Sequence, residues 1–302
     1  METLDLSAIT WENWDLIGRY LGAGLALGLG GIGAAVGMGN AAAQANASIG
    51  RQPETQGMML RTMLIGQAVG GSPSIFALVI GLLILFAGAS APVEGGASTA
   101  ALIGAGLSIG LGCFGSGLGC GWPAGKACEG VARNPRRSTS VSSMMIIGQA
   151  VAQSPSIFAT VIALILIFVP MSFTGWAVFG VCLGAGIAMG AGALGPGMGS
   201  GSTAGGAIDG MGRWPNSQGI TLRTMLITQA VSQTPAIFGR VVAFIMMFAM
   251  RELEAGFMGF AKTIGAGIAV GFGGIGPGIG SGMAGETACQ ATAARPRLDA
   301  LV

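Results

Sequence analysis

Residues Arg51 to Ala87 read RQPETQGMMLRTMLIGQAVGGSPSIFALVIGLLILFA. This stretch begins with a short polar loop that contains an Arg-x-Pro motif, and it continues into a long apolar run that ends in bulky aliphatic residues. The same features return in the same order twice more. RQP, RNP and RWP begin at Arg51, Arg133 and Arg213; QAV begins at Gln67, Gln149 and Gln229; SPSIF, SPSIF and TPAIF begin at Ser72, Ser154 and Thr234. The chain therefore contains an internal repeat with a period of about 80 residues.

A glycine-rich apolar run precedes each polar loop. The first contains GAGLALGLGGIGAAVGMGN from Gly22 to Asn40, and GAG returns at Gly104, Gly184 and Gly265. Because apolar runs of about 20 residues or more can cross a bilayer as helices, each repeat predicts a transmembrane hairpin with a glycine-rich first arm and a bulkier second arm. The expected spans are 17–47, 58–88, 98–131, 140–170, 175–211, 220–250 and 257–293.

These spans predict an all-α membrane protein of three tandem transmembrane hairpins plus a seventh helix. A weaker RPR motif begins at Arg295, and the sequence closes on ARPRLDALV, where the second arm of a fourth hairpin would begin. An odd number of helices places the two ends on opposite sides of the membrane. The expected divisions are an N-terminal segment at 1–16, hairpins at 17–96, 97–173 and 174–253, and a half hairpin with its tail at 254–302.

The composition agrees with a membrane protein and argues against several chemistries. Of the 302 residues, 52% are hydrophobic and only 9% are charged, whereas soluble domains carry about 25% charged residues. The sequence has no histidine, the commonest metal ligand, and its five cysteines lie within apolar runs. It shows no nucleophile–base pair and no phosphate-binding loop that follows a strand. We therefore expect no metal, no cofactor, no nucleic-acid partner and no catalytic site in this chain.

The distribution of loop charge predicts the orientation. The Arg-x-Pro side collects Arg51, Arg61, Arg133, Arg136, Arg137, Arg213, Arg223, Arg295 and Arg297. The opposite side has Arg19, Arg251 and Lys262 together with Glu12, Asp15, Glu94, Glu252 and Glu254. Because positively charged loops stay on the cytoplasmic side, we expect cytoplasmic Arg-x-Pro loops, an external N-terminus and a place in the bacterial inner membrane.

Small residues mark the packing face of the first arms. In the first repeat they recur at helical spacing at Gly24, Gly28, Gly31, Ala35 and Gly39, and the last arm contains GGIGPGIGSG from Gly273 to Gly282. Such stripes let helices approach closely. Their recurrence in every first arm favours a tight circle of first arms inside a wider ring of second arms. The alternative is ordinary pairing of small residues inside one compact bundle.

A glycine-rich first arm, an Arg-Gln-Pro loop and a GQAV-containing second arm with an aliphatic end resemble the c subunit (proteolipid) of rotary F-type ATP synthases. The stretch from Arg51 to Ala87 is especially similar to the sodium-translocating type, and the resemblance covers nearly the whole chain. It implies a rotor ring, built with other c-type hairpins or copies of the chain itself, in contact with membrane lipid and with stalk and stator subunits. The loop positions implied to face the stalk are Arg51, Gln52, Pro53, Arg133, Asn134, Pro135, Arg213, Trp214 and Pro215.

In that family a second-arm carboxylate carries a proton or sodium ion past the stator. Sodium-type members surround the ion with a first-arm glutamine, the hydroxyl that follows the carboxylate, and a tyrosine one turn on. The resemblance places the carboxylate on Gly71, Gln153 and Gln233, and the hydroxyl on Ser72, Ser154 and Thr234. The glutamine position falls on Met38, Cys120, Ser200 and Ser281, and the tyrosine position on Phe76, Phe158 and Phe238. The ion cage is therefore nearly dismantled.

The loss of the carboxylate changes the expected mechanism. An amide cannot titrate, so Gln153 and Gln233 imitate a permanently neutral carrier, and Gly71 offers no side chain. We expect no hairpin of this chain to translocate an ion by the family's usual route. The prolines Pro73, Pro155 and Pro235 should interrupt each second helix near the same level.

Arg240 and Glu286 are candidates for contact with a partner. Arg240 lies on the same helical face as the third carboxylate position. It could snorkel to the outer interface, pair with an acid on a partner helix, or act directly in an ion pathway. Glu286, in the last arm, could be a relocated carrier. The remaining charged groups near the Arg-x-Pro loops, expected at the interface, are Lys126, Glu129 and Asp209.

The sequence is compatible with two functions. The first is a rotor-ring component of a rotary ATP synthase or ATPase that contributes hairpins to a proton- or sodium-driven ring but carries no ion itself. The alternative is a non-translocating structural ring or scaffold derived from a c-type proteolipid, with a different partner complex. A secondary transporter fits poorly, because transporters of the repeat type commonly use inverted repeats around a polar midplane site.

Overall fold

The computed structural model describes residues 11–88, 97–170, 175–250 and 256–296, and every regular element in these ranges is helical. The first arms are α1 (Trp11–Arg51), α4 (Ala97–Arg133), α7 (Trp176–Arg213), and α10 (Phe257–Gly273) with α11 (Ile275–Ala294). The second arms are α2 (Gln56–Gly70) with α3 (Ser72–Phe86), α5 (Ser138–Ala152) with α6 (Ser154–Phe168), and α8 (Gln218–Ser232) with α9 (Thr234–Phe244). A π-helical turn, η5 (Ile245–Ala249), follows α9, and the 3-10 helices η2 (Pro53–Thr55), η3 (Pro135–Arg137) and η4 (Pro215–Ser217) begin the second arms.

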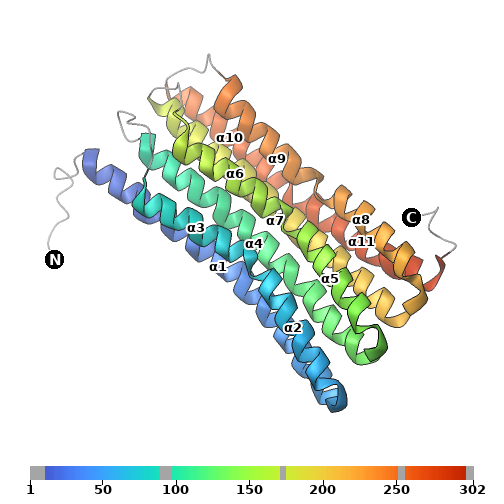
Figure 1. The fold of residues 1–302 in the computed structure, drawn as a ribbon. Helices are drawn as coiled ribbons and strands as arrows, with labels where there is room; N and C mark the ends of the chain where they lie inside the picture. The colour runs from blue at the N-terminus through green and yellow to red at the C-terminus, as the bar shows by residue number, and fades with distance from the viewer. Residues whose placement is uncertain (1–10, 89–96, 171–174, 251–255, 297–302) are drawn as a thin grey trace, which may run out of the picture.

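Within these ranges the elements build seven helices that are long and apolar enough to cross a membrane. The expected all-α membrane fold of three hairpins plus a seventh helix is confirmed. Along the helix axes, α1 begins at one end of the molecule and α11 ends at the other (Figure 1). Several positions used in the charge argument lie outside the described residues, namely the segment 1–10 and the side chains of Glu12, Glu94, Arg251, Glu252, Glu254 and Arg297.

The helices form two layers rather than one compact bundle (Figure 1). Each first arm packs along the next first arm, α1 on α4, α4 on α7, and α7 on α10 and α11. Each of the first two second arms lies against its own first arm and against the next one, as α2 and α3 do against α1 and α4. The result is an arc of a double ring, with first arms inside and second arms outside. The arc supports the ring expectation over the compact bundle.

Each second arm is interrupted at one level. The breaks fall at Gly71, Gln153 and Gln233, two residues before Pro73, Pro155 and Pro235. Proline has no N–H and its ring crowds the carbonyl four residues earlier. The helical bond to Val69 is therefore absent in the first repeat, and those to Val151 and Val231 are absent in the next two. The predicted interruptions are present, and they remove the regular helical donor of one backbone carbonyl in each second arm.

Glycine allows the first arms to meet backbone to backbone. A Cβ on Gly117 would lie 2.5 Å from the Ala34 nitrogen, and a Cβ on Gly278 would lie 2.5 Å from the Pro196 nitrogen. Gly197, at the same repeat position, would place its Cβ 2.6 Å from the Ser116 nitrogen. One interface geometry therefore recurs three times, and each copy requires a residue without a side chain.

The predicted small-residue stripe of the first arm lies on an open edge of the arc. A Cβ on Gly24, Gly28, Gly31 or Gly39 would meet no atom of the described residues within 4 Å. The opposite edge, on α10 and α11, is also lined by glycines with open space beside them, at Gly265, Gly276 and Gly280. Both edges thus keep the small-residue surface that elsewhere joins one first arm to the next.

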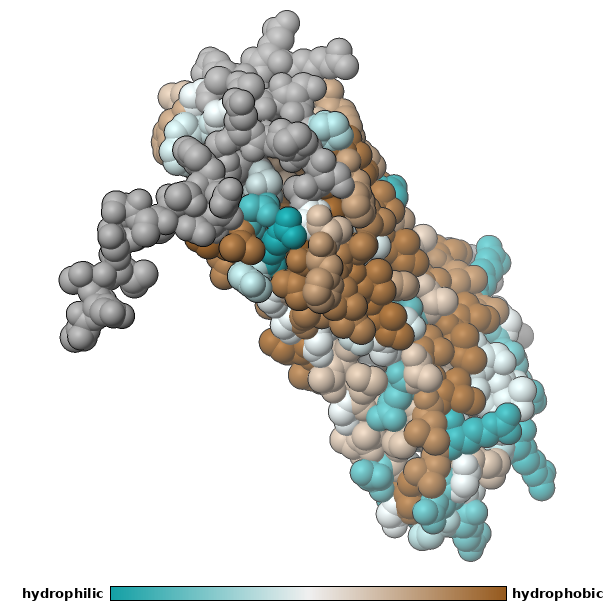
Figure 2. Space-filling view, turned by 60° about the vertical axis from the view of Figure 1, so that its left-hand side comes forward, coloured by the Kyte–Doolittle hydropathy of each residue, from teal (hydrophilic) through white to brown (hydrophobic). Residues whose placement is uncertain are grey.

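The outer surface is apolar along most of its length. Figure 2 shows a broad band of hydrophobic side chains along the body, with hydrophilic groups gathered mainly toward one end. The exposed large hydrophobic side chains include Leu78, Val79, Leu82 and Phe86 of α3. A surface of this kind on helices of this length is suited to lipid.

Candidate functional site

The second-arm glutamines at the old carboxylate level connect neighbouring hairpins. The Nε2 of Gln153 donates to the carbonyl oxygen of Val69 at 2.7 Å, and the Nε2 of Gln233 donates to that of Val151 at 2.6 Å. These carbonyls are the ones left without their helical donor by Pro73 and Pro155. A side chain of one repeat therefore replaces the hydrogen bond that a proline removed from the previous repeat.

The QAV glutamines form a second set of connections one turn away. Gln149 Nε2 donates to the carbonyl of Cys120 in its own first arm and to that of Gly66 in the previous second arm, both at 2.9 Å. Gln229 repeats this pattern with Ser200 at 2.9 Å and Gly148 at 3.1 Å. Both glutamines are completely buried. The sequence marks them only as part of a recurring motif; their role as connectors depends on which backbones pack beside them.

The first hairpin has only part of this arrangement. Gln67 Nε2 donates to the carbonyl of Met38 in its own first arm at 3.0 Å. Gly71 has no side chain, and the Met38 sulfur lies 3.5 Å from the position its Cβ would take. The thioether thus borders the space that a longer side chain at residue 71 would enter. The first hairpin offers no side-chain donor at residue 71 to a preceding second arm.

The remaining ion-cage positions do not converge on a ligand. Ser200 Oγ lies 3.2 Å from Ser232 Oγ, and Ser281 Oγ donates to the carbonyl of Pro277 in its own helix at 2.7 Å. Among the described residues, the hydroxyls of Ser72, Ser154 and Thr234 make no hydrogen bond, and no three acidic or cysteine side chains form a group that could hold a metal ion. In the same part of the chain, no carboxylate makes a hydrogen bond with Gln153 or Gln233. The arrangement therefore connects helices through amides at the positions that the resemblance assigns to the ion carrier.

The acidic residues near the Arg-x-Pro loops are held by basic neighbours. Arg133 contacts Glu129 of its own arm at 3.2 Å and Asp209 of the next first arm at 2.5 Å. Arg213 contacts Asp209 at 3.0 Å, and Lys126 contacts Glu129 at 3.3 Å. These groups lie at the loop end of α4 and α7, where the sequence placed them. The Arg133–Asp209 pair connects neighbouring first arms through a charge-assisted hydrogen bond, and the other three pairs lie within one arm.

The loop positions expected to face a stalk form the short turns between first and second arms. Gln52, Asn134 and Trp214 are each the single residue between the end of a first arm and the 3-10 helix that starts the second arm. Trp214 is 52% exposed. The structure thus presents the three turns at one end of the arc.

Arg240 and Glu286 have partners that the sequence did not indicate. The guanidinium of Arg240 lies over the Phe158 ring, with 4.1 Å from its central carbon to the ring centroid. Phe158 belongs to the preceding second arm, so the contact again joins two repeats. The half-buried Glu286 carboxylate accepts a hydrogen bond from the Ser202 hydroxyl of α7. Neither contact was visible in the sequence, because both join residues about 80 positions apart.

Together these features define a class of membrane protein. Tandem helical hairpins form an arc of a double ring through glycine-to-backbone packing, and the amides of Gln153 and Gln233 connect successive second arms. Such a chain is a ring-forming proteolipid.

Comparison with known proteins identifies the family of the chain. The model of the family described as the C subunit of ATP synthase matches four times, at residues 21–84, 103–166, 183–246 and 264–300. The chain belongs to this ATP synthase family. It is a c-type ring component in which the hairpin is repeated in tandem.

Relatives of two sizes support the assignment. The K subunit of the A-type ATP synthase of Methanocaldococcus jannaschii is 32% identical over 197 residues, which cover 64% of this chain and 81% of that protein. The ATP synthase c subunit of Natranaerobius thermophilus is 55% identical over 79 residues, 26% of this chain and 91% of that protein. The ATP synthase c subunit of Alkaliphilus oremlandii is 46% identical over 82 residues, 27% of this chain and 92% of that protein. The shorter relatives each match about one repeat.

Proposed function

We propose that this chain forms a sector of the rotor ring of an ATP synthase and that its own hairpins carry no ion. The observation that carries the proposal is the pair of amide bonds from Gln153 to Val69 and from Gln233 to Val151. Family members need a group that is charged at the stator and neutral in lipid. An amide has one charge state at every pH, and here it is also engaged with the neighbouring helix.

In a turning ring, the hairpins of this chain would give rotation steps in which no ion moves, here called silent steps. Gln153 and Gln233 can pass through lipid because they are neutral and hydrogen-bonded. They have no proton to release and no anionic oxygen for a sodium ion. Each such hairpin rotates past the stator without moving an ion, so the ring moves fewer ions per turn than it has hairpins. Carriage then depends on carboxylate-bearing c-type hairpins in the same ring.

An apolar groove supports the proposal of a neighbouring hairpin. The groove between α8–α9 and α10–α11 encloses about 620 Å³. Pro235 leaves the Val231 carbonyl without its helical donor, as Pro73 and Pro155 do for Val69 and Val151. In the first two repeats the next second arm supplies the missing donor. The groove residues are Val231, Thr234, Pro235, Phe238, Ala269, Val270, Gly273, Gly274, Pro277 and Ser281.

The occupant proposed for this groove is the second arm of another c-type hairpin with a hydrogen-bond donor in the register of Gln153 and Gln233. A protonated carboxyl or an amide would serve equally well at the Val231 carbonyl. The pattern repeats twice within the chain, and the same packing at the third position requires no new type of contact.

The proposed setting is a bacterial inner membrane with the three Arg-x-Pro turns on the cytoplasmic side, in contact with a stalk. Its support is the concentration of arginine at that end and the bilayer rule for positive loops. Arg133 and Arg213 are already engaged with Asp209. The exposed side chains of Trp214 and Arg51, the latter without an ion pair in the described ranges, are therefore available for a stalk contact.

A scaffold without torque is the second candidate. Arg240 favours it, because this cation lies on an outer helix that would have to pass the stator in a turning ring. Its contact with Phe158 holds the charge in place without neutralising it.

The test is purification of the full chain in a gentle detergent, followed by mass spectrometry of everything that remains bound. A rotor sector predicts recovery of catalytic-head subunits together with a carboxylate-bearing c-type hairpin. A ring recovered with neither head nor stalk subunits would contradict the proposal and favour the scaffold. Lipid alone in the groove, with no second hairpin, would contradict the proposed occupant.

A functional measurement completes the test. In the reconstituted complex, replacing both Gln153 and Gln233 by glutamate should raise the number of ions moved per ATP, because two silent steps gain a carrier. An unchanged ion-to-ATP ratio in a complex that still turns over would show that these positions do not lie on the ion path.

A further inference from the structure

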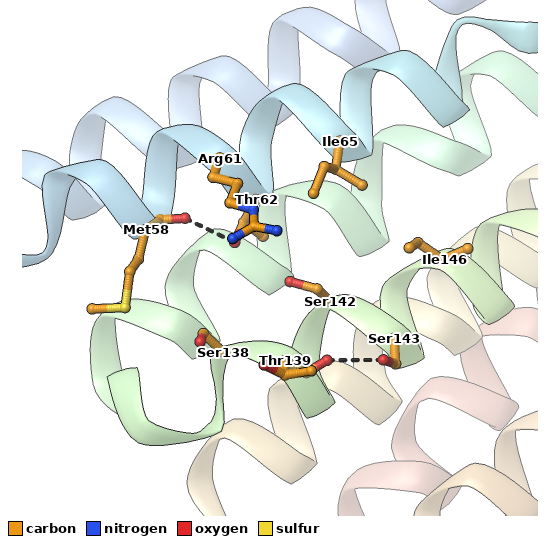
Figure 3. Close-up of a pocket in the computed structure, with 9 residues that line it drawn as sticks. All are labelled: Met58, Arg61, Thr62, Ile65, Ser138, Thr139, Ser142, Ser143 and Ile146. Carbon is orange, nitrogen blue, oxygen red and sulfur yellow. Dashed lines mark hydrogen bonds between the residues drawn. The ribbon is translucent and has the colours of Figure 1, made fainter.

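A pocket lies between α2 and α5 at the Arg-x-Pro end of the outer layer (Figure 3). It has a volume of about 180 Å³ and opens on the outer surface. Its lining joins one cation, four hydroxyl-bearing side chains of α5 and apolar groups from both helices. The lining residues are Met58, Arg61, Thr62, Ile65, Ser138, Thr139, Ser142, Ser143 and Ile146.

The cation in this pocket has no partner in the described part of the chain. The exposed Arg61 side chain extends from α2 toward α5 (Figure 3), and within the described ranges it makes no ion pair or hydrogen bond. The hydroxyls of Ser138 and Ser142 are also free of hydrogen bonds within those ranges. Ser143 donates to the Thr139 carbonyl at 2.9 Å. One guanidinium and at least two free hydroxyls thus face the same space.

The α5 side of the pocket, called the hydroxyl wall, consists of Ser138, Thr139, Ser142 and Ser143 and is particular to this repeat. Counting back from the QAV glutamines, the positions of Ser142 and Ser143 are held by leucine and arginine in the first and third repeats. α5 begins with STSVSS, whereas α2 begins with QGMMLR and α8 with QGITLR. A leucine in place of Ser142 would close the polar wall with an apolar side chain. Arg61 therefore faces a wall of hydroxyl donors that the other two repeats lack.

The depth of Arg61 matches the headgroup level of a bilayer. The second arm Pro53–Phe86 has 34 residues, about 51 Å at 1.5 Å per residue. The hydrocarbon core is about 30 Å thick, so a centred helix has its core between about residues 60 and 80. Arg61 then lies at the edge of the hydrocarbon, where phosphate groups lie. The apolar residues Ile65 and Ile146 lie about one turn deeper, where acyl chains begin.

We propose that this pocket binds the phosphate of an anionic membrane phospholipid. Arg61 supplies a planar fork of donors that matches phosphate, and the Ser138 and Ser142 hydroxyls add neutral donors. Ile65 and Ile146 border the first part of the acyl chain, and Met58 lies on the loop side of Arg61, at headgroup level. The exposed residues Arg136 and Arg137 directly precede α5 and add positive charge near the pocket, which favours an anionic headgroup.

The test measures lipid retained by the purified full-length chain in native mass spectrometry, with phosphatidylglycerol or phosphatidylcholine of the same acyl chains. Wild-type chain should retain phosphatidylglycerol in preference to phosphatidylcholine. Arg61→Gln should weaken phosphatidylglycerol binding by about tenfold, because it removes charge-assisted bonds to the phosphate. Ser142→Leu, which installs the residue of the other repeats, should weaken it by about threefold.

Matched variants and a competitor separate this site from general attraction. Arg223→Gln alters the corresponding arginine of the third repeat, outside the pocket, and should leave the Arg61-dependent binding unchanged. Arg61→Lys keeps the charge but loses the planar fork, so it should bind less than wild type and more than Arg61→Gln. An unchanged unfolding temperature of Arg61→Gln guards against a folding defect. Equal retention by wild-type and Arg61→Gln chains would overturn the proposal. So would displacement of the lipid by millimolar inorganic phosphate, which would identify a site for a soluble anion, and so would equal binding of phosphatidylcholine.

Discussion

The side-chain amide of Gln153 donates to the carbonyl oxygen of Val69, 2.7 Å away, and the two residues belong to successive second arms. The Val69 carbonyl needs this bond because residue 73 is proline and supplies no N–H. Gln233 and Val151 repeat the relationship one hairpin later. The position that the resemblance assigns to the ion carrier thus connects two hairpins here, and its amide bonds the backbone carbonyl whose helical donor the proline of the preceding repeat removes.

Removing one of these connections should loosen the arc. Replacing Gln153 by leucine removes the side-chain donor of the Val69 carbonyl in an apolar layer. We expect a loss of about 1 kcal/mol in the free energy of unfolding, the size typical of a hydrogen bond between membrane helices. The measurement is reversible unfolding in mixed micelles. Gln218→Leu is the control, because the Gln218 amide makes no hydrogen bond within the described ranges, and equal losses in the two variants would contradict the connecting role of Gln153.

Adding one methyl group to a glycine of the first arms should distinguish packing within the chain from packing between chains. Gly117→Ala puts a Cβ 2.5 Å from the Ala34 nitrogen, and overpacking of this kind costs about 1–3 kcal/mol. Thermal unfolding of the isolated chain should report this loss.

The matched change on the open edge should behave differently. Gly28→Ala meets nothing among the described residues within 4 Å, so the isolated chain should keep its unfolding temperature. If α1 joins another first arm in the ring, this variant should instead lower the yield of the assembled ring on a size-exclusion column. A ring yield that matches wild type would show that this edge is not an interface.

Because residue 35 is alanine, we expect the α1 edge to pack less closely against another first arm than the first arms inside the chain pack against each other. The corresponding residues of the next three first arms are Gly117, Gly197 and Gly278, and each lies against a neighbouring backbone. A Cβ at this position should keep the preceding first arm farther away. Ala35→Gly should therefore raise the fraction of assembled ring that survives increasing detergent, as read by native mass spectrometry. A reduced fraction would mean that the alanine methyl group itself makes the contact.

The contact of Arg240 with Phe158 should appear as a coupling energy. In a double-mutant cycle of Arg240→Leu and Phe158→Leu, we expect about 0.5–2 kcal/mol of interaction, the range for cation–π pairs. Phe76 and Thr160 hold the corresponding positions one repeat earlier, where threonine replaces the cation. The cycle of Phe76→Leu and Thr160→Leu should give a coupling near zero. Similar couplings in both cycles would assign the effect to ordinary packing.

Most of the fold and part of the site could be predicted from the sequence. The repeated motifs, the length of each apolar run and the prolines predict seven spanning helices with breaks at Gly71, Gln153 and Gln233. These features are local, because bilayer thickness sets span length and proline removes a donor wherever it occurs. The residue types at Gly71, Gln153 and Gln233 are equally plain in the sequence, and their reading as a lost ion carrier stays a prediction.

The partners of the polar groups were decided only by the tertiary structure. Spacing places Gln153 at the level of the old ion site, but the packing of one second arm beside the next brings its amide to the Val69 carbonyl. The same holds for Arg240 over Phe158 and for Arg133 between Glu129 and Asp209. The sequence by itself determines which groups exist and at what depth, because helical rise and bilayer thickness are constant. Contacts between repeats about 80 residues apart depend on how closely the glycine faces let the helices approach, and only the assembled arc determines that distance.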